Sequence, residues 1–314
     1  MDDRTETRAG AIPKEVLGWL AHGPILGMVC ILVATFFFSS TNAIIRALSS
    51  DLPPVEISFF RSLFGVLLQL PLVLWFGLGS IKTTRLPWHI ARGVLHAVSM
   101  ILWFVALSMV PLAETAALEF AAPIMATIIA ILFLGEVARM RRLIALAVGI
   151  AGVFIVVRPG FDAVSWGQIL VLISVTLWAG CQLIIRELGR TDSAFIQGFY
   201  TAIVFVPITA AVAIPVWVWP SWTELAVCAV IAAGSTIGIW FYGEAFRRAE
   251  MTAILPLEST KLLWAVLYGV VFFAEQPEVL TLVGGVIIFA AAAYITIREA
   301  QLARRTIMAP VTGE

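Results

Sequence analysis

The sequence predicts an all-α integral membrane protein with ten transmembrane helices arranged as two inverted five-helix repeats. Three observations predict this fold: the composition, the spacing of the apolar runs, and a similarity between the two halves of the chain. Of the 314 residues, 61% are hydrophobic and 13% are charged. A soluble domain carries about 25% charged residues, so the composition excludes a soluble globular protein.

Apolar runs of about 18–25 residues follow one another along almost the whole chain. Each is long enough to cross the hydrocarbon core of a bilayer, which takes about 20 helical residues. Because the runs are continuously apolar, without the alternation of a barrel strand, they exclude a transmembrane β-barrel. The connections between them are too short for a soluble domain. The predicted helices span residues 25–48, 55–78, 88–109, 113–134, 142–157, 164–186, 194–217, 222–245, 251–273 and 279–297.

The positions of Lys and Arg predict the orientation of the chain, because these residues concentrate in cytoplasmic loops. With the N-terminus in the cytoplasm, sixteen of the 20 Lys and Arg residues lie on the cytoplasmic side. Arg46 and Arg158 then lie on the opposite side, and Arg61 and Lys261 lie within helices. We therefore expect a multi-pass protein of the bacterial inner membrane with both termini in the cytoplasm.

The two halves of the chain resemble each other at two places. Residues 39–51 are similar to residues 179–192, and residues 103–120 are similar to the segment that begins at residue 240. The similarity pairs Asn42 with Gln182, Arg46 with Arg186, Trp103 with Trp240 and, after a two-residue slip, Glu119 with Glu258. Because each half holds an odd number of helices, the second half must cross the membrane upside down. Inverted repeats are typical of alternating-access carriers, whose binding site lies between the halves.

Several segments carry a resemblance to a known family. They are the end of the first helix, SSTNAIIR, the segment EISFFRSLFG at 56–65, and the repeated block of small residues, proline and a terminal Glu at 114–136 and 251–275. On these segments the chain resembles a drug/metabolite transporter (DMT) superfamily protein of the EamA type. The organisation that follows is a tail at 1–24, a first EamA repeat at 25–160, a second, inverted repeat at 161–298 and a tail at 299–314.

The resemblance implies a secondary transporter of a small polar or zwitterionic metabolite that works by alternating access across the inner membrane. Members of the family handle amino acids and their derivatives, S-adenosylmethionine, riboflavin and other solutes. The segments of this chain look closest to members associated with S-adenosylmethionine or riboflavin uptake. Lys261 is a departure, because members often carry an acidic or neutral residue there.

Four ionisable residues fall inside the predicted helices, where a charge is costly and therefore marks a functional candidate. Arg61 and Glu119 each lie about six residues from the outer end of a helix, or roughly 9 Å deep, so we expect them to pair. Glu258 and Lys261 are three residues apart on one helix face and are expected to pair locally. Two interpretations stay open: the pairs only hold helices together, or at least one residue contacts the substrate or a coupling ion.

Two prolines favour the second interpretation. Pro123 removes the backbone hydrogen bond to the carbonyl of Glu119, and Pro256 removes the one to the carbonyl of Thr252. We therefore expect both helices to be loosened beside Glu119 and Glu258. Free carbonyls at membrane depth are tolerated where they line a cavity.

Further residues within the helices could bind substrate, or could instead serve packing, which is the more common role of a single histidine or tryptophan in a helix. His96 lies deep in a helix and could couple a proton to transport, because histidine titrates near neutral pH. Asn42 and Gln182 could bind polar groups or cap backbone. The tryptophans that could wall a planar substrate, or only pack, are Trp103, Trp178, Trp240 and Trp264.

Other functions find little support in the sequence. No GxxxxGK[ST] loop for nucleotide binding and no HExxH or GxSxG motif occurs, and the three cysteines and three histidines are scattered. We therefore expect no enzyme activity, metal or cofactor, and the formal net charge of zero gives no reason to expect nucleic-acid binding. The alternative to a transporter is a membrane-embedded structural or sensing protein without transport activity. Small residues in helices 142–157 and 279–297 suit close packing, within a monomer or in a homodimer.

Overall fold

The computed structural model describes residues 23–76, 83–133, 135, 140–158, 164–189, 191–192 and 194–308. Every regular element within these residues is a helix. The helices are α2 (Pro24–Leu48), α3 (Pro54–Phe76), α4 (Leu86–Met109), α5 (Leu112–Glu119), α6 (Ala122–Phe133), α7 (Met140–Val157), α8 (Trp166–Leu188), α9 (Ala194–Ala213), the 3₁₀ turn η2 (Ile214–Val216), α10 (Trp222–Arg248), α11 (Met251–Glu258), α12 (Thr260–Phe273) and α13 (Val279–Met308).

The predicted all-α membrane class is confirmed. Nine spans in the described part of the chain are long and apolar enough to cross a membrane. A tenth helix, α3, has 23 residues and contains Glu56, Arg61 and Gln69. Ten spans and their inversion therefore stay predictions. At the C-terminal end, α13 continues to Met308, past the predicted end of the last helix at residue 297.

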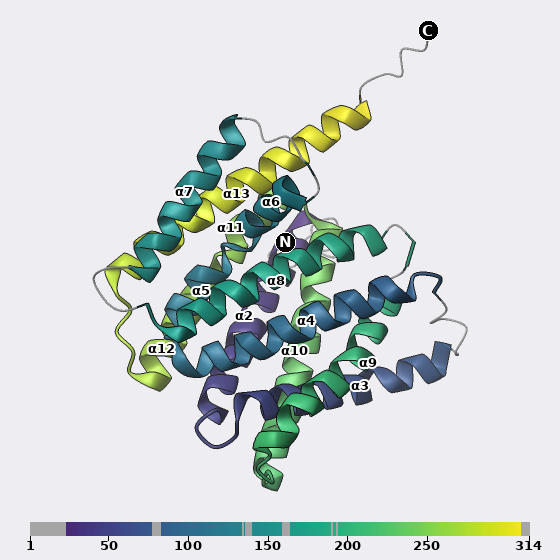
Figure 1. The fold of residues 1–314 in the computed structure, drawn as a ribbon. Coiled ribbons are helices and arrows are strands. Elements are labelled where there is room, and N and C mark those ends of the chain that lie inside the picture. Colours follow the sequence, from purple (N-terminus) through teal and green to yellow (C-terminus); the bar gives the residue numbers. More distant parts are fainter. Residues whose placement is uncertain are drawn as a thin grey trace, which may run out of the picture.

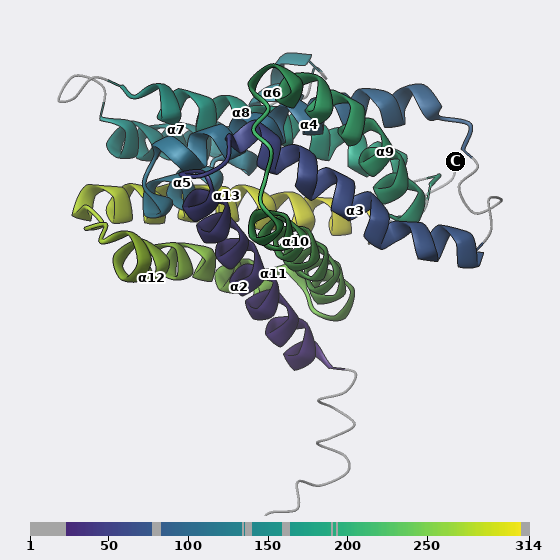
Figure 2. The same cartoon turned by 90° about the horizontal axis from the view of Figure 1, so that it is seen from below.

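The helices pack in pairs that lie far apart in the sequence. The most extensive contacts join α2 to α10, α4 to α8, α13 to α7, and α3 to α9. Figure 1 shows α7 and α13 side by side. In Figure 2, α2, α10, α11 and α12 lie below α13, whereas α4, α7 and α8 lie above it.

Glycines allow the close approach of α7 and α13. A Cβ atom on Gly152 would lie 2.8 Å from Cγ1 of Ile288, and one on Gly284 would lie 2.6 Å from Cγ2 of Val156. Small residues at helix contacts of this kind are common in membranes. The small-residue faces of both helices are thus used within the chain. A homodimer through these helices stays a prediction, and it would have to use their outer faces.

Two of the predicted helices are interrupted. The helix predicted at 113–134 is divided into α5 and α6 by Phe120 and Ala121, and the one at 251–273 into α11 and α12 by Ser259. Each interruption follows directly after one of the two intramembrane glutamates. Pro123 in the first turn of α6 accounts for the first interruption, because its nitrogen cannot bond to the carbonyl of Glu119. Broken helices of this kind form binding sites in many transporters.

Candidate functional site

Three charged side chains meet at the interruptions of the two helices. The Nζ atom of Lys261 lies 3.2 Å from Oε1 of Glu119 and 3.3 Å from Oε1 of Glu258. The hydroxyl of Tyr242 also donates to Oε1 of Glu258, at 3.3 Å. We call Glu119, Glu258 and Lys261 the charged triad. It joins the C-terminal ends of α5 and α11 to the start of α12.

Aromatic rings border the charged triad. The ammonium of Lys261 lies 5.5 Å from the ring centre of Phe38 and 5.9 Å from that of Tyr242, within the range of cation–π attraction. The side chain of Lys261 is 12% exposed, that of Glu258 is 19% exposed and that of Glu119 is 31% exposed. The triad is therefore partly open, and its formal charge is −1 when both carboxylates are ionised.

The structure confirms one predicted ion pair and corrects the other. Glu258 and Lys261 do pair, as their spacing predicts. The prediction that Arg61 pairs with Glu119 is wrong, because Lys261 takes that place. Arg61 instead donates to Oγ of Ser235 at 3.3 Å and to Sδ of Met100 at 2.8 Å. The reason is lateral position: α3 packs against α4, α9 and α10, whereas α5 packs against α12 and α13, and equal depth does not bring two helices together.

The amide and tryptophan candidates divide into those near the site and those away from it. Trp103 donates its Nε1–H to Oδ1 of Asn42 at 3.3 Å, and Asn42 lies one turn beyond Phe38 on α2. Trp264 stacks on Tyr268 with ring centres 6.4 Å apart. By contrast, Gln182 is exposed, and Trp240 is 63% exposed and packs on Phe241, so neither joins the charged triad.

His96 lies between two aromatic rings. Its ring centre is 4.6 Å from that of Trp178 and 4.7 Å from that of Phe205. Its Nδ1 atom is buried and has no hydrogen-bond partner among the described residues. His96 is one turn from Met100, the sulfur of which contacts Arg61, so it lies beside Arg61 rather than beside the charged triad.

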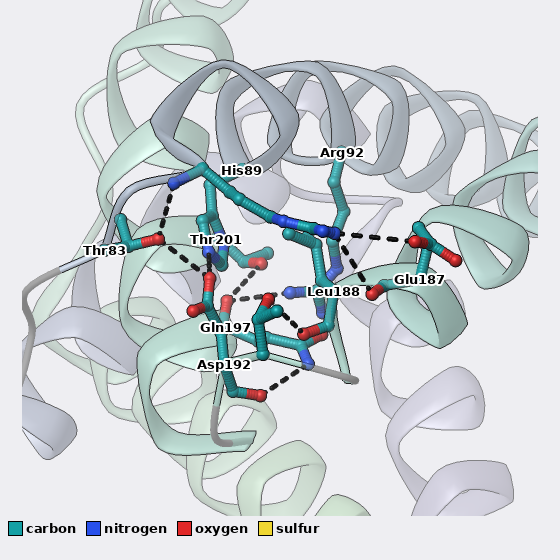
Figure 3. Close-up of polar contacts among 10 residues, drawn as sticks. Thr83, His89, Arg92, Glu187, Leu188, Asp192, Gln197 and Thr201 are labelled. Carbon is teal, nitrogen blue, oxygen red and sulfur yellow. Dashed lines mark hydrogen bonds and ion pairs between the residues drawn. The ribbon is translucent and has the colours of Figure 1, made fainter.

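A buried polar cluster at the N-terminal end of α4 was not predicted from the sequence. Nε2 of His89 lies 2.6 Å from Oδ2 of Asp192, which also accepts from the Thr83 hydroxyl at 2.8 Å. Arg92 donates to the backbone oxygen of Gln197 at 2.8 Å (Figure 3). We call these five residues the α4 polar cluster. Because His89 and Asp192 are 103 positions apart, no local spacing could join them. The sequence signal was limited to polar residues near the start of α4 and after the end of α8.

We expect replacement of Asp192 by Asn to destabilise the protein at neutral pH. The hydrogen bond from His89 holds the pKa of the Asp192 carboxyl below its usual range, so the ionised carboxylate stabilises the fold above the ordinary pKa of about 3.9. That stabilisation disappears as the pH falls through the lower native pKa. We expect Asp192→Asn to cost about 1–3 kcal/mol at pH 7, the usual range for a disrupted buried hydrogen bond.

Thermal unfolding of the purified protein measures this effect. Asp51 is exposed, so Asp51→Asn is the matched control and should leave the melting temperature unchanged. The difference between wild type and Asp192→Asn should shrink as the buffer is made more acidic than pH 4. Equal melting temperatures at pH 7 would contradict the assignment.

A second group of charges lies at the C-terminal end of α4, close to the start of α5. Arg46 pairs with Glu275 at 2.5 Å, and Glu275 accepts the backbone N–H of Leu112, the first residue of α5, at 3.0 Å. Arg158 pairs with Glu278 nearby. Two cavities of about 170 and 270 Å³ lie here, both lined by Pro111, Glu114, Arg158 and Glu278. They are separate from the charged triad.

Comparison with known proteins gives a family match over most of the chain. The profile of the EamA-like transporter family matches it twice, at residues 25–158 and 165–297. One solved crystal structure is similar in fold, with a TM-score of 0.58 at 17% identity over 87% of this chain and 96% of that chain.

Three named relatives are similar along nearly their whole length. An S-adenosylmethionine uptake transporter of Rickettsia conorii is 27% identical over 90% of this chain and 96% of its own. The pseudopaline exporter CntI of Pseudomonas aeruginosa is 29% identical over 84% of this chain and 94% of its own. A riboflavin transporter of Vibrio cholerae is 26% identical over 91% of this chain and 98% of its own.

Proposed function

The chain belongs to the EamA-like transporter family, and from this premise we propose that it is a secondary transporter that works by alternating access. Its cargo would be a small polar or zwitterionic organic metabolite. Relatives are named for S-adenosylmethionine uptake, pseudopaline export and riboflavin transport. We infer that the solute is an amino acid derivative, an S-adenosylmethionine-like solute or a riboflavin-like solute.

The charged triad is the observation that carries this proposal. Ionisable side chains at membrane depth are expensive and are typical of substrate and ion pathways. Here three of them meet at two helix interruptions, and all three side chains are partly exposed. We also propose that transport is coupled to protons and that the carboxylates of the triad take part.

The pattern of helix packing supports a repeat that relates the two halves of the chain. If the second half repeats the first, α2 corresponds to α8, α3 to α9, α4 to α10 and α7 to α13. Exchanging the halves then turns the contact between α2 and α10 into the contact between α8 and α4. It leaves the contacts of α3 with α9 and of α7 with α13 unchanged. These are the four most extensive contacts in the described part of the chain.

Cysteine accessibility in intact cells tests the inversion and the inner-membrane orientation. Asp51 and Thr191 are exposed and follow equivalent helices, α2 and α8. We expect a membrane-impermeant maleimide to label Asp51→Cys in intact cells and Thr191→Cys only after the cells are opened. The natural cysteines, Cys30, Cys181 and Cys228, are buried and give little background. Labelling of both positions from the same side would refute the inversion.

Transport itself is tested in two steps. A thermal-shift screen of the purified protein against amino acids, S-adenosylmethionine and riboflavin identifies ligands, since a ligand that binds only the folded protein raises its melting temperature. Proteoliposomes with and without a pH gradient then measure uptake of the hits. We expect accumulation that collapses with the gradient. A ligand that binds but never crosses the membrane would favour the sensing alternative.

A further inference from the structure

Among the described residues, Arg61 is a partly buried cation without an anionic partner. Its guanidinium contacts two neutral groups, the hydroxyl of Ser235 and the thioether of Met100. Within the part of the chain that the structure describes, no carboxylate lies within ion-pair distance of it. A guanidinium offers five N–H donors in a fork that fits a carboxylate. A hydroxyl and a sulfur use few of these donors and neutralise no charge, so Arg61 retains the capacity to bind an anion.

The helix α10 connects Arg61 to the charged triad. Ser235, which contacts Arg61, precedes Tyr242, which contacts Glu258, by two helical turns. Two turns of helix correspond to about 10 Å. Gly238 lies between them, and a Cβ atom there would be 2.9 Å from the ring of Phe38. The ring of Phe38 therefore packs over α10 between the two charged groups.

The helix α4 makes a second connection. Met100, the sulfur of which contacts Arg61, is one turn from Trp103. Trp103 donates to Asn42, which lies one turn from Phe38 on α2. Arg61 of α3 thus contacts α4 and α10, while α2 and α10 border the group of charge −1, and an amide and aromatic rings lie between the two.

We propose that Arg61 binds the carboxylate of the transported solute, while the cationic group of that solute lies at Glu119 and Glu258. The solute is then amino-acid-like, with separated positive and negative charges. This inference rests on the proposed transport function and narrows its substrate class. Two parallel N–H···O bonds from Arg61 would neutralise the guanidinium in the membrane. A solute without a carboxylate would leave it unpaired.

Matched pairs of probes test this assignment, because they differ only in the carboxylate. The pairs are S-adenosylmethionine with its decarboxylated form, arginine with agmatine, and lysine with cadaverine, and riboflavin is the probe without a carboxylate. Dissociation constants are measured on the purified full-length protein. We expect at least one carboxylate-bearing probe to bind the wild type ten-fold or more tightly than its partner.

Variants of Arg61 separate binding from folding. We expect Arg61→Gln to bring the ratio of the two dissociation constants close to one, and Arg61→Lys to keep part of the preference. Arg247 has an 80% exposed side chain, so Arg247→Gln is the control and should keep the full ratio. Ligand-free melting temperatures report whether each variant is folded. The comparison of probe pairs on the wild type needs no variant.

Four outcomes would overturn the assignment. The first is equal binding of both members of every pair that binds the wild type. The second is a folded Arg61→Gln protein that keeps the preference for the carboxylate. The third is binding of riboflavin alone, which would refute the role of Arg61 and leave the proposed transport function standing. Absence of binding by every probe would contradict both proposals.

Discussion

Replacement of Lys261 by methionine is expected to abolish transport and to destabilise the protein. The ammonium of Lys261 lies within 3.3 Å of both carboxylates, so its removal leaves two like charges together at membrane depth. Breaking a buried ion pair by removing one partner costs about 3–5 kcal/mol. Uptake into proteoliposomes and the melting temperature measure the two effects. A variant that transports at the wild-type rate would rule out a role for Lys261.

A second substitution separates the two interpretations of the charged triad. In the double variant Glu119→Gln, Lys261→Met, one carboxylate and the cation are removed together, and the formal charge of −1 is restored. If the triad only holds helices together, transport should recover along with stability. We expect the melting temperature to recover and transport to stay absent, because the substrate or coupling ion then lacks the Glu119 carboxylate.

Two single variants, each of which replaces one carboxylate of the charged triad by an amide, complete this set of substitutions. We expect Glu119→Gln and Glu258→Gln each to reduce transport at least ten-fold, a loss equivalent to about 1.4 kcal/mol, with normal membrane insertion. Glu224 lies in the capping box of α10, where a glutamine can also serve, so Glu224→Gln is the control. Wild-type transport in both single variants would contradict the site assignment.

The second large effect is expected where α7 meets α13. A leucine at Gly152 cannot be accommodated, because even its Cβ would lie 2.8 Å from Ile288 and 3.1 Å from the backbone nitrogen of that residue. Overpacking a core costs typically 1–3 kcal/mol, and here backbone must also move. We therefore expect Gly152→Leu to yield little folded protein, or protein with a clearly lower melting temperature.

A glycine in open space gives the control for this prediction. A Cβ atom on Gly243 would have no atom within 4 Å, and Gly243 is also within a helix, α10. Gly243→Leu should therefore behave as the wild type in size-exclusion chromatography and thermal unfolding. If the two leucine variants were equally stable, the close packing of α7 and α13 would not be important for the fold.

The fold could be predicted from the sequence largely because the bilayer imposes a simple rule. A helix in lipid must be about 20 residues long and apolar, so helices such as α2 and α8 end within a few residues of their predicted limits. The exact positions of the interruptions at Ser259 and at Phe120 could not be predicted from the sequence. The prolines indicated loosened helices, but which residue ends each segment depends on tertiary packing.

The site was predictable where the contacts are local and not where they are distant. A spacing of three residues brings Glu258 and Lys261 together, and a sequence shows that spacing directly. The pair of Lys261 with Glu119 joins residues 142 positions apart, and it depends on which helices are neighbours. The sequence predicted Arg61 as the partner of Glu119 because both residues lie at a similar predicted depth in the membrane. Hydropathy gives the position of a residue along the membrane normal, but it does not show which helices are neighbours.

The helix ends at the charged triad have an electrostatic consequence. Glu119 and Glu258 are the last residues of α5 and α11, and Lys261 is the second residue of α12. The C-terminal end of a helix carries partial negative charge and the N-terminal end partial positive charge. All three residues thus have the same sign as the helix end that holds them. The triad therefore depends on its mutual contacts, and a solute cation beside the two carboxylates would further offset the unfavourable charges at the ends of α5 and α11.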